Sequence, residues 1–117
     1  MTTLLGDHPT VTGAVPSYGV VRAVDQRTGG CRLDVEDPGG GRTSLHVACA
    51  PSPRAASALR DAGLRPLALR LDVDGSDRLA CSVLVTSEHG PQRRPVPLGT
   101  VLALCADGVH TVLTHER

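Results

Sequence analysis

The side chains best suited to chemistry in this chain are four cysteines and five histidines. The cysteines are Cys31, Cys49, Cys81 and Cys105, and no two of them form the C-x-x-C pair of a zinc ribbon. The nearest histidine to a cysteine is His46, three residues before Cys49 on an expected strand, so their side chains face opposite sides. The sequence therefore predicts no metal site and no cofactor.

All four cysteines fall in the apolar register of the element expected to carry them. Cysteine behaves as a small hydrophobic residue and is often buried. The N-terminus lacks the basic and apolar regions of a secretion signal, so disulfides are not expected. We expect thiols that fill a core.

The spacing of the histidines singles out no nucleophile or carboxylate that could act with one of them in acid–base catalysis. His110 and His115 lie on one expected strand with opposite parity, whereas His46 and His110 approach one another if their strands pair. The chain has no G-x-S-x-G elbow and no motif that pairs a cysteine with an activating histidine. The question of enzymatic activity stays open, and the pattern favours a protein without it. The full set is His8, His46, His89, His110 and His115.

Two segments invite a binding role. The glycines at Gly39–Gly41 precede a strand and lack the following Lys-Ser/Thr, so they form a turn and not a phosphate loop. The stretch GPQRRPVP combines extended prolines with two arginines suited to an acidic partner. Its candidate partner-binding residues are Arg93, Arg94 and Pro95, and the alternative is a stiff connector to the following helix.

Composition narrows the class of protein. The 117 residues are 40% hydrophobic with zero net charge, as expected of one globular domain. The chain lacks Phe, Trp, Ile, Lys and Asn, which indicates a GC-rich bacterial genome. Balanced charge and one aromatic residue, Tyr18, argue against nucleic-acid binding. The apolar runs are too short to span a membrane, so we expect a cytoplasmic protein without a membrane partner.

The hydrophobic period places six strands and two helices. The second strand alternates cleanly, with Cys31, Leu33 and Val35 on one face. The strand from Leu79 is apolar on both faces, which favours a central position in a sheet. The expected strands are Gly19–Asp25, Cys31–Glu36, Thr43–Cys49, Leu67–Val73, Leu79–Thr86 and Val109–His115, with a polar loop over Ser87–Val96.

Each helix is followed by a glycine and then a strand. Ser52 and Pro53 predict the N-cap and first position of a helix that runs to Ala62, and Gly63 ends it. The second helix, about Leu98–Asp107, carries Leu98, Val101, Leu102 and Cys105 on one face. The first helix carries Ala55, Leu59 and Ala62 on its apolar stripe.

From Thr43 onward the order β-α-β-β-α-β predicts an α+β fold. Two crossovers around a central hairpin favour a ferredoxin-like plait, here preceded by an N-terminal β-hairpin. Residues 1–16 are expected to be a flexible or irregular segment, and residues 17–117 the single domain. The alternative is a mostly-β sandwich or barrel with one or two short helices.

This element order is similar to that of effector-binding ACT domains and small ferredoxin-like oxygenases. The resemblance implies a ligand site on the open sheet face. The stretch from Ala50 to Pro53 departs from the Asp-x-x-Gly pattern of an ACT domain. The candidate ligand-binding residues are Tyr18, His46, Arg70 and His110.

Taken together, these patterns favour a non-catalytic regulatory or protein-interaction domain. A small sheet with Val and Leu faces tends to hide an edge or face against a copy of itself, so we expect a homodimer or higher oligomer. Another protein is a second expected partner. The alternative is a small-ligand-binding effector domain, or a small enzyme, that uses the open face of the sheet.

Overall fold

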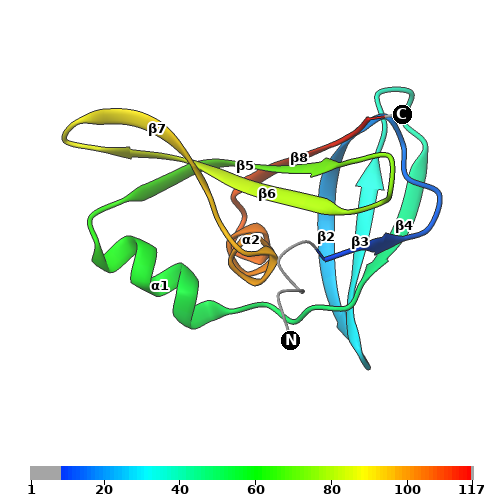
Figure 1. Cartoon of the computed structure of the whole chain (residues 1–117), viewed down its shortest axis with the longest axis horizontal. Coiled ribbons are helices and arrows are strands. Elements are labelled where there is room, and N and C mark those ends of the chain that lie inside the picture. The colour runs from blue at the N-terminus through cyan, green and yellow to red at the C-terminus, as the bar shows by residue number, and fades with distance from the viewer. Residues whose placement is uncertain (1–8, 117) are drawn as a thin grey trace.

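The computed structural model describes residues 9–116, so residues 1–8, His8 among them, and residue 117 lie outside the described part. The chain forms one mixed sheet of eight strands with two helices (Figure 1). The α+β class is therefore confirmed. The elements are β1 (Val11–Thr12), β2 (Tyr18–Arg27), β3 (Gly30–Glu36), β4 (Arg42–Val47), α1 (Pro53–Asp61), β5 (Arg65–Val73), β6 (Leu79–Ser87), β7 (Gly90–Pro95), α2 (Leu98–Ala106) and β8 (His110–His115).

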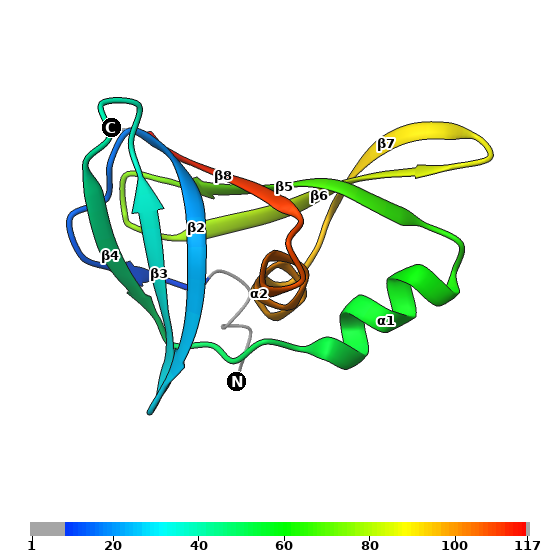
Figure 2. The ribbon, with the colours of Figure 1, turned by 180° about the vertical axis from the view of Figure 1, so that it is seen from behind.

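The strands lie in the order β1-β4-β3-β2-β8-β5-β6-β7. Neighbours are antiparallel except β5 and β8, which are parallel. Figures 1 and 2 show β2, β3 and β4 standing across the direction of β5, β6 and β8, so the sheet is strongly curled. The N-terminal hairpin thus joins the C-terminal half of the chain through β8.

Backbone hydrogen bonds connect β1 to the start of β6. The Val11 amide donates to the Asp77 carbonyl at 2.9 Å, and the Leu79 amide donates to the Pro9 carbonyl at 2.7 Å. Thr10 forms an antiparallel bridge with Arg78 between them. Because β1 also pairs with β4, these contacts form a closing seam between two distant parts of the curled sheet.

The ferredoxin-like plait is not confirmed. A plait would place β4, β5, β6 and β8 in one four-stranded antiparallel sheet. Here β3, β2 and β8 separate β4 from β5, and β8 runs parallel to β5. The mostly-β alternative with two short helices is closer to the structure, because β8 pairs with β2 of the N-terminal hairpin.

The segment expected to be a loop between Ser87 and Val96 contains a strand, so that expectation is corrected. β7 pairs along β6 through a tight turn at Glu88 and His89. The Val96 amide donates to the Cys81 carbonyl at 3.0 Å, which fixes the hydrogen-bonded pairs of this ladder. Because hydrogen-bonded and non-hydrogen-bonded pairs alternate along the ladder, the backbone nitrogens of residues 91, 93 and 95 point away from β6.

The helices lie on the inner side of the curl. The Ser52 side chain accepts a hydrogen bond from the Ala55 amide at 3.3 Å, and Gly63 ends α1 with φ +80°. The expected stripe of α1 is corrected, because Ala56 is its buried residue whereas Ala62 is exposed. α1 packs mainly on α2 rather than on the sheet. Within residues 9–116, no helix is long and apolar enough to cross a membrane.

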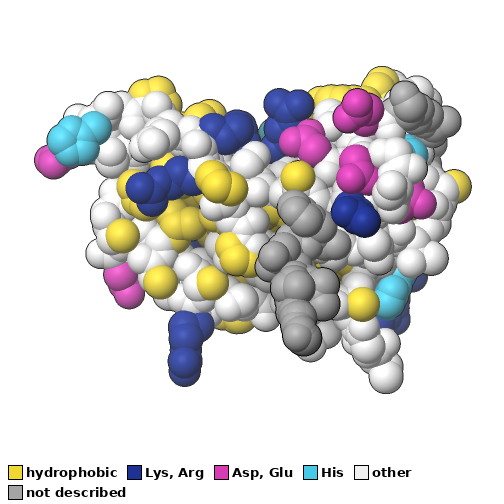
Figure 3. Space-filling view, viewed as in Figure 1, with side chains coloured by type: hydrophobic (Ala, Val, Ile, Leu, Met, Phe, Trp, Pro, Cys, Tyr) yellow, Lys and Arg dark blue, Asp and Glu magenta, His cyan; other side chains and the backbone are white. Residues whose placement is uncertain are grey.

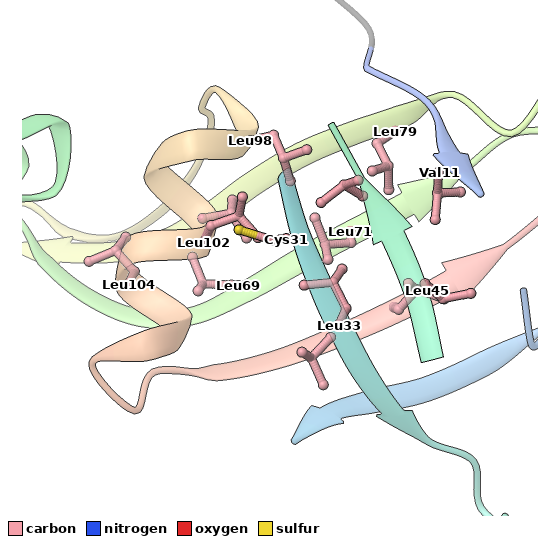
Figure 4. Close-up of a cluster of buried hydrophobic side chains, with 14 of the residues drawn as sticks. Val11, Cys31, Leu33, Leu45, Leu69, Leu71, Leu79, Leu98, Leu102 and Leu104 are labelled. Carbon is pink, nitrogen blue, oxygen red and sulfur yellow. The ribbon is translucent and has the colours of Figure 1, made fainter. Parts of the chain in front are cut away.

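The core consists of Val, Leu and Ala side chains between α2 and the inner face of the sheet (Figure 4). α2 is buried on nearly all sides, from Leu98 to Leu104, because it fills the curl. Cys31 is fully buried, and Cys49, Cys81 and Cys105 are partly buried against the core. The expectation that the thiols contribute to the core is confirmed.

One apolar residue departs from its expected face. A register shift between Pro66 and Ala68 places Leu67 in a bulge of β5, and its exposed fraction is 42%. Leu69, Leu71 and Val73 follow the expected alternation and are buried. The bulge explains the difference, because an extra residue in one strand interrupts the period of two.

Candidate interaction surface

Five neighbouring strands present a continuous surface that faces away from the core. We call this surface, formed by β2, β8, β5, β6 and β7, the outer face. Residues paired across strands share one side of a sheet, so the registers define its rows. The upper row is Tyr18, Thr114, Asp72 and Ala80; the middle row is Val20, Val112, Arg70, Ser82 and Pro95; the lower row is His110, Ala68, Leu84 and Arg93.

Three of the four candidate ligand-binding residues lie on the outer face. Tyr18, Arg70 and His110 occupy different rows within three adjacent strands, and all three are exposed. The fourth, His46, lies on β4, where it pairs with Arg32. Because β3 and β2 separate β4 from β8, the expected approach of His46 and His110 does not occur.

The candidate partner-binding residues divide between the two sides of β7. Arg93 and Pro95 pair with Leu84 and Ser82, which places them on the outer face. Arg94 pairs with Val83, so it belongs to the opposite side, although it is exposed.

Hydrogen bonds link the rows of the outer face. Asp72 Oδ1 accepts from Arg70 Nε at 2.8 Å and from Thr114 Oγ1 at 2.6 Å. A guanidinium nitrogen of Arg93 donates to Ser82 Oγ at 2.9 Å. Exposed ion pairs contribute little stability, so the main effect of these contacts is to hold the charged groups in place.

A hollow of about 540 Å³ lies beside the β5–β6 turn and includes part of the upper row. Of this lining, sequence reasoning selected Arg70; it placed Asp72 on an outward face without selecting it, and it did not consider Thr114. The period of two places Asp72 on the side of Arg70 and Thr114 on the side of His110, but their proximity depends on the pairing of β5 with β8, which the period does not show. The lining residues are Arg70, Asp72, Val73, Asp74, Arg78, Leu79, Ala80, Thr114, His115 and Glu116.

His115 points toward a different part of the molecule from His110. Its Nδ1 lies 3.3 Å from the Val15 carbonyl oxygen, and its Nε2 lies 3.6 Å from Asp77 Oδ1. The side chain is 14% exposed. These contacts place His115 beside the closing seam, between the N-terminal segment and the β5–β6 turn.

The thiols are poor nucleophiles in this fold. Burial raises the pKa of Cys31, Cys49 and Cys105, and the thiol of Cys49 also contributes to the rise at Cys31. Burial, with smaller contributions from Cys49 and Asp72, raises the pKa of Cys81 to about 12. A thiolate is the reactive form of cysteine, so these shifts lower the reactivity of all four thiols. Among residues 9–116, no three His, Cys, Asp or Glu side chains form a group that could hold a metal ion.

Neither helix covers the outer face, which is the upper side of the sheet in Figure 1. The chain matches no protein-family model, no curated protein and no solved structure. The fold and the surface therefore define the class: a small α+β protein with a curled mixed sheet, one face packed on helices and the other open.

Proposed function

We propose that the protein is a non-catalytic protein-interaction domain that binds a protein partner through its outer face. The observation that carries this proposal is the composition of the uncovered rows. Tyr18 is 43% exposed, and half-buried aliphatic side chains lie between it and arginines. Tyr and Arg around an apolar centre are typical of the residues that contribute most to protein interfaces. The aliphatic residues are Val20, Ala68, Leu84 and Val112.

The face is a better binding surface than either edge of the sheet. At the β7 edge, residues 91 and 95 are prolines, so two of the three outward backbone positions have no N–H to donate. At the other edge, β1 has two residues and is already bonded to Asp77 and to β4. Both features disfavour the addition of a strand from another chain.

The chemistry of the side chains supports a role without catalysis. Burial suppresses the thiolate form of the cysteines, as their raised pKa values indicate. His46 and His110 lie on strands that two others separate. The aromatic, charged and aliphatic side chains of the outer face are suited to binding a partner rather than to making or breaking bonds.

A photo-crosslinking amino acid tests the proposal in the native host. It replaces Ala80, an exposed residue of the outer face, or Arg54, an exposed residue of α1 on the inner side of the sheet that serves as the control. We expect the variant at position 80 to form an adduct with one discrete protein, identified by mass spectrometry, and the variant at position 54 to form much less. Equal adducts from both positions, or none from position 80, would contradict the proposal.

The hollow beside the β5–β6 turn favours a second candidate function, the binding of a small polar ligand. Its volume of about 540 Å³ is within the usual range of ligand sites, and Arg70 and Asp72 supply opposite charges. Such an effector or small enzyme domain gains stability from its ligand. A thermal-shift screen with amino acids and nucleotides tests this. A reproducible rise in Tm that Arg70→Ala abolishes favours it, and no shift from any compound counts against it.

A further inference from the structure

The outer face carries opposite charges at its two ends. Asp72 and Asp74 lie where β5 ends, and Glu116 continues the outer parity of β8 beyond Thr114. The Glu116 amide donates to the Val73 carbonyl at 2.8 Å, which holds this residue against the end of β5. We call this the acidic end. Arg70, which is paired with Asp72, and the nearby Arg78 offset two of these three charges, so the acidic end keeps an excess of one negative charge.

The opposite end of the same face is basic. Arg93 lies in the lower row, and Arg65 lies farther along β5, where it pairs with Thr86. Thr86 has the same parity as Leu84, so the Arg65 side chain shares the outer face. Figure 3 shows most acidic side chains of this view at the right, near the β5–β6 turn, with arginines beside them, and further arginines to the left, over β6 and β7, with an acidic side chain at the far left end.

Between these ends lies a nearly uncharged band. The middle row contains Val20, Val112, Ser82 and Pro95, and its one charged residue, Arg70, is paired with Asp72. The surface therefore has an apolar centre with a basic end and an acidic end, which is the pattern of a self-complementary patch.

We infer that the partner of the outer face is a second copy of this chain, docked about a twofold axis through the middle row; this rests on the proposed function. Rotation by 180° about an axis along the middle row exchanges the upper and lower rows. The basic end of one copy therefore lies on the acidic end of the other. The two apolar centres meet at the axis.

Two further properties favour a copy of the chain over another partner chemistry. A twofold axis parallel to the strands would oppose like charges, so the charges select the axis that runs along the middle row. The formal net charge of the chain is zero, so two copies carry no overall repulsion. With both sheet edges protected, the dimer is closed and does not extend into a fibre.

Charge reversal at the two ends tests the inference. Arg93→Glu places a carboxylate opposite the acidic end of the partner, and Glu116→Arg places a guanidinium opposite the basic end. We expect the wild-type protein to dimerise in sedimentation equilibrium at low salt, and each variant to weaken the dimer by about tenfold or more. An equimolar mixture of the two variants restores association, because every contact between the ends is again between opposite charges.

Further variants keep the result interpretable. Arg54→Glu makes the same change of charge at an exposed position of α1, on the inner side of the sheet, and leaves the dimer unchanged. Arg65→Glu repeats the basic-end test at a second exposed position if Arg93→Glu fails to fold. The dimer also weakens as salt is raised, since exposed charges are screened.

A monomeric wild type at all concentrations, or a dimer that neither reversal weakens, would overturn the inference. A mixture of variants that fails to restore the dimer also contradicts the twofold arrangement. The crosslinking experiment separates this inference from the proposed function. An adduct from position 80 with a different protein supports the proposed function and overturns only the assignment of the partner as a second copy.

Discussion

At the scale of single residues, burial controls the chemistry of the thiols. Cys81 lies on β6 with its side chain against the core, and its pKa is raised to about 12 from the usual 9.0. A rise of this size lowers the thiolate fraction at pH 8 by about a thousandfold. We therefore expect iodoacetamide to alkylate Cys81 far more slowly in the folded protein than in urea, as followed by peptide mass spectrometry.

The same shift makes stability depend on pH with a defined sign. The folded pKa lies above the unfolded value, so the unfolded chain loses its proton first. The stabilisation is complete below about pH 9 and is lost as pH rises from 9 toward 12. Urea unfolding should show this fall, and Cys81→Ala should reduce it. Alkylation of Cys81 at equal rates in the folded and unfolded chain would contradict the assignment.

The candidate site residues show what side-chain alternation along a single strand can and cannot predict. Alternation along each strand correctly assigned Arg70 and His110 to the side away from the core, whereas Tyr18 lay just before its expected strand and received no face. It could not show that these residues are near one another, because that depends on β8 lying between β2 and β5. The pairing of strands distant in sequence is not encoded in the period of either strand.

At the scale of elements, the β2–β3 hairpin requires glycine at one position for two reasons. Gly30 has φ +156°, and a Cβ there would overlap the carbonyl oxygen of Val47 on β4. The adjacent Gly29 has φ +82° and open space around it. Gly29→Ala therefore adds backbone strain of about 1 kcal/mol, whereas Gly30→Ala adds an overlap and should cost roughly 3 kcal/mol or more.

Urea unfolding of the two variants measures this difference. The pair is matched, since both make the same change at neighbouring positions of one turn. Equal losses of unfolding free energy in the two variants would show that the approach of β4 to this hairpin is not a tight constraint.

Helices and most strands were predictable because their signals are local. Ser52, Pro53 and Gly63 mark both ends of α1, and the helix forms between them. β7 was missed because its prolines indicated a loop. Those prolines occupy an edge strand at positions whose nitrogen faces away from β6, the one strand setting where proline removes no ladder hydrogen bond. Gly90, with φ +93° after a short turn, was the available signal for a hairpin.

At the scale of the whole molecule, the closing seam makes distant parts of the chain one unit. The plait predicted from element order placed the N-terminal hairpin before the plait as an extra element, whereas β2 pairs with β8 and β1 meets β6. These pairings join residues near opposite ends of the chain, so they form only when most of the molecule is ordered. The order of strands was therefore beyond local sequence reasoning.

The seam yields a test of cooperativity. Val11 is 4% exposed and contributes to the core, whereas Thr12 on the same strand is exposed. Val11→Ala removes two buried methyl groups and leaves a small cavity, which should lower the free energy of unfolding by about 2 kcal/mol. Thr12→Ala, the matched control, should change it by no more than about 0.5 kcal/mol.

Hydrogen exchange shows whether the seam opens with the rest of the fold. The Leu79 amide, bonded to the Pro9 carbonyl, is its reporter. If the sheet is one cooperative unit, this amide exchanges with the free energy of global unfolding, and Val11→Ala lowers both quantities equally. An amide that exchanges much faster than global unfolding, with a global stability that Val11→Ala leaves unchanged, would mean that β1 lies on the sheet without closing it.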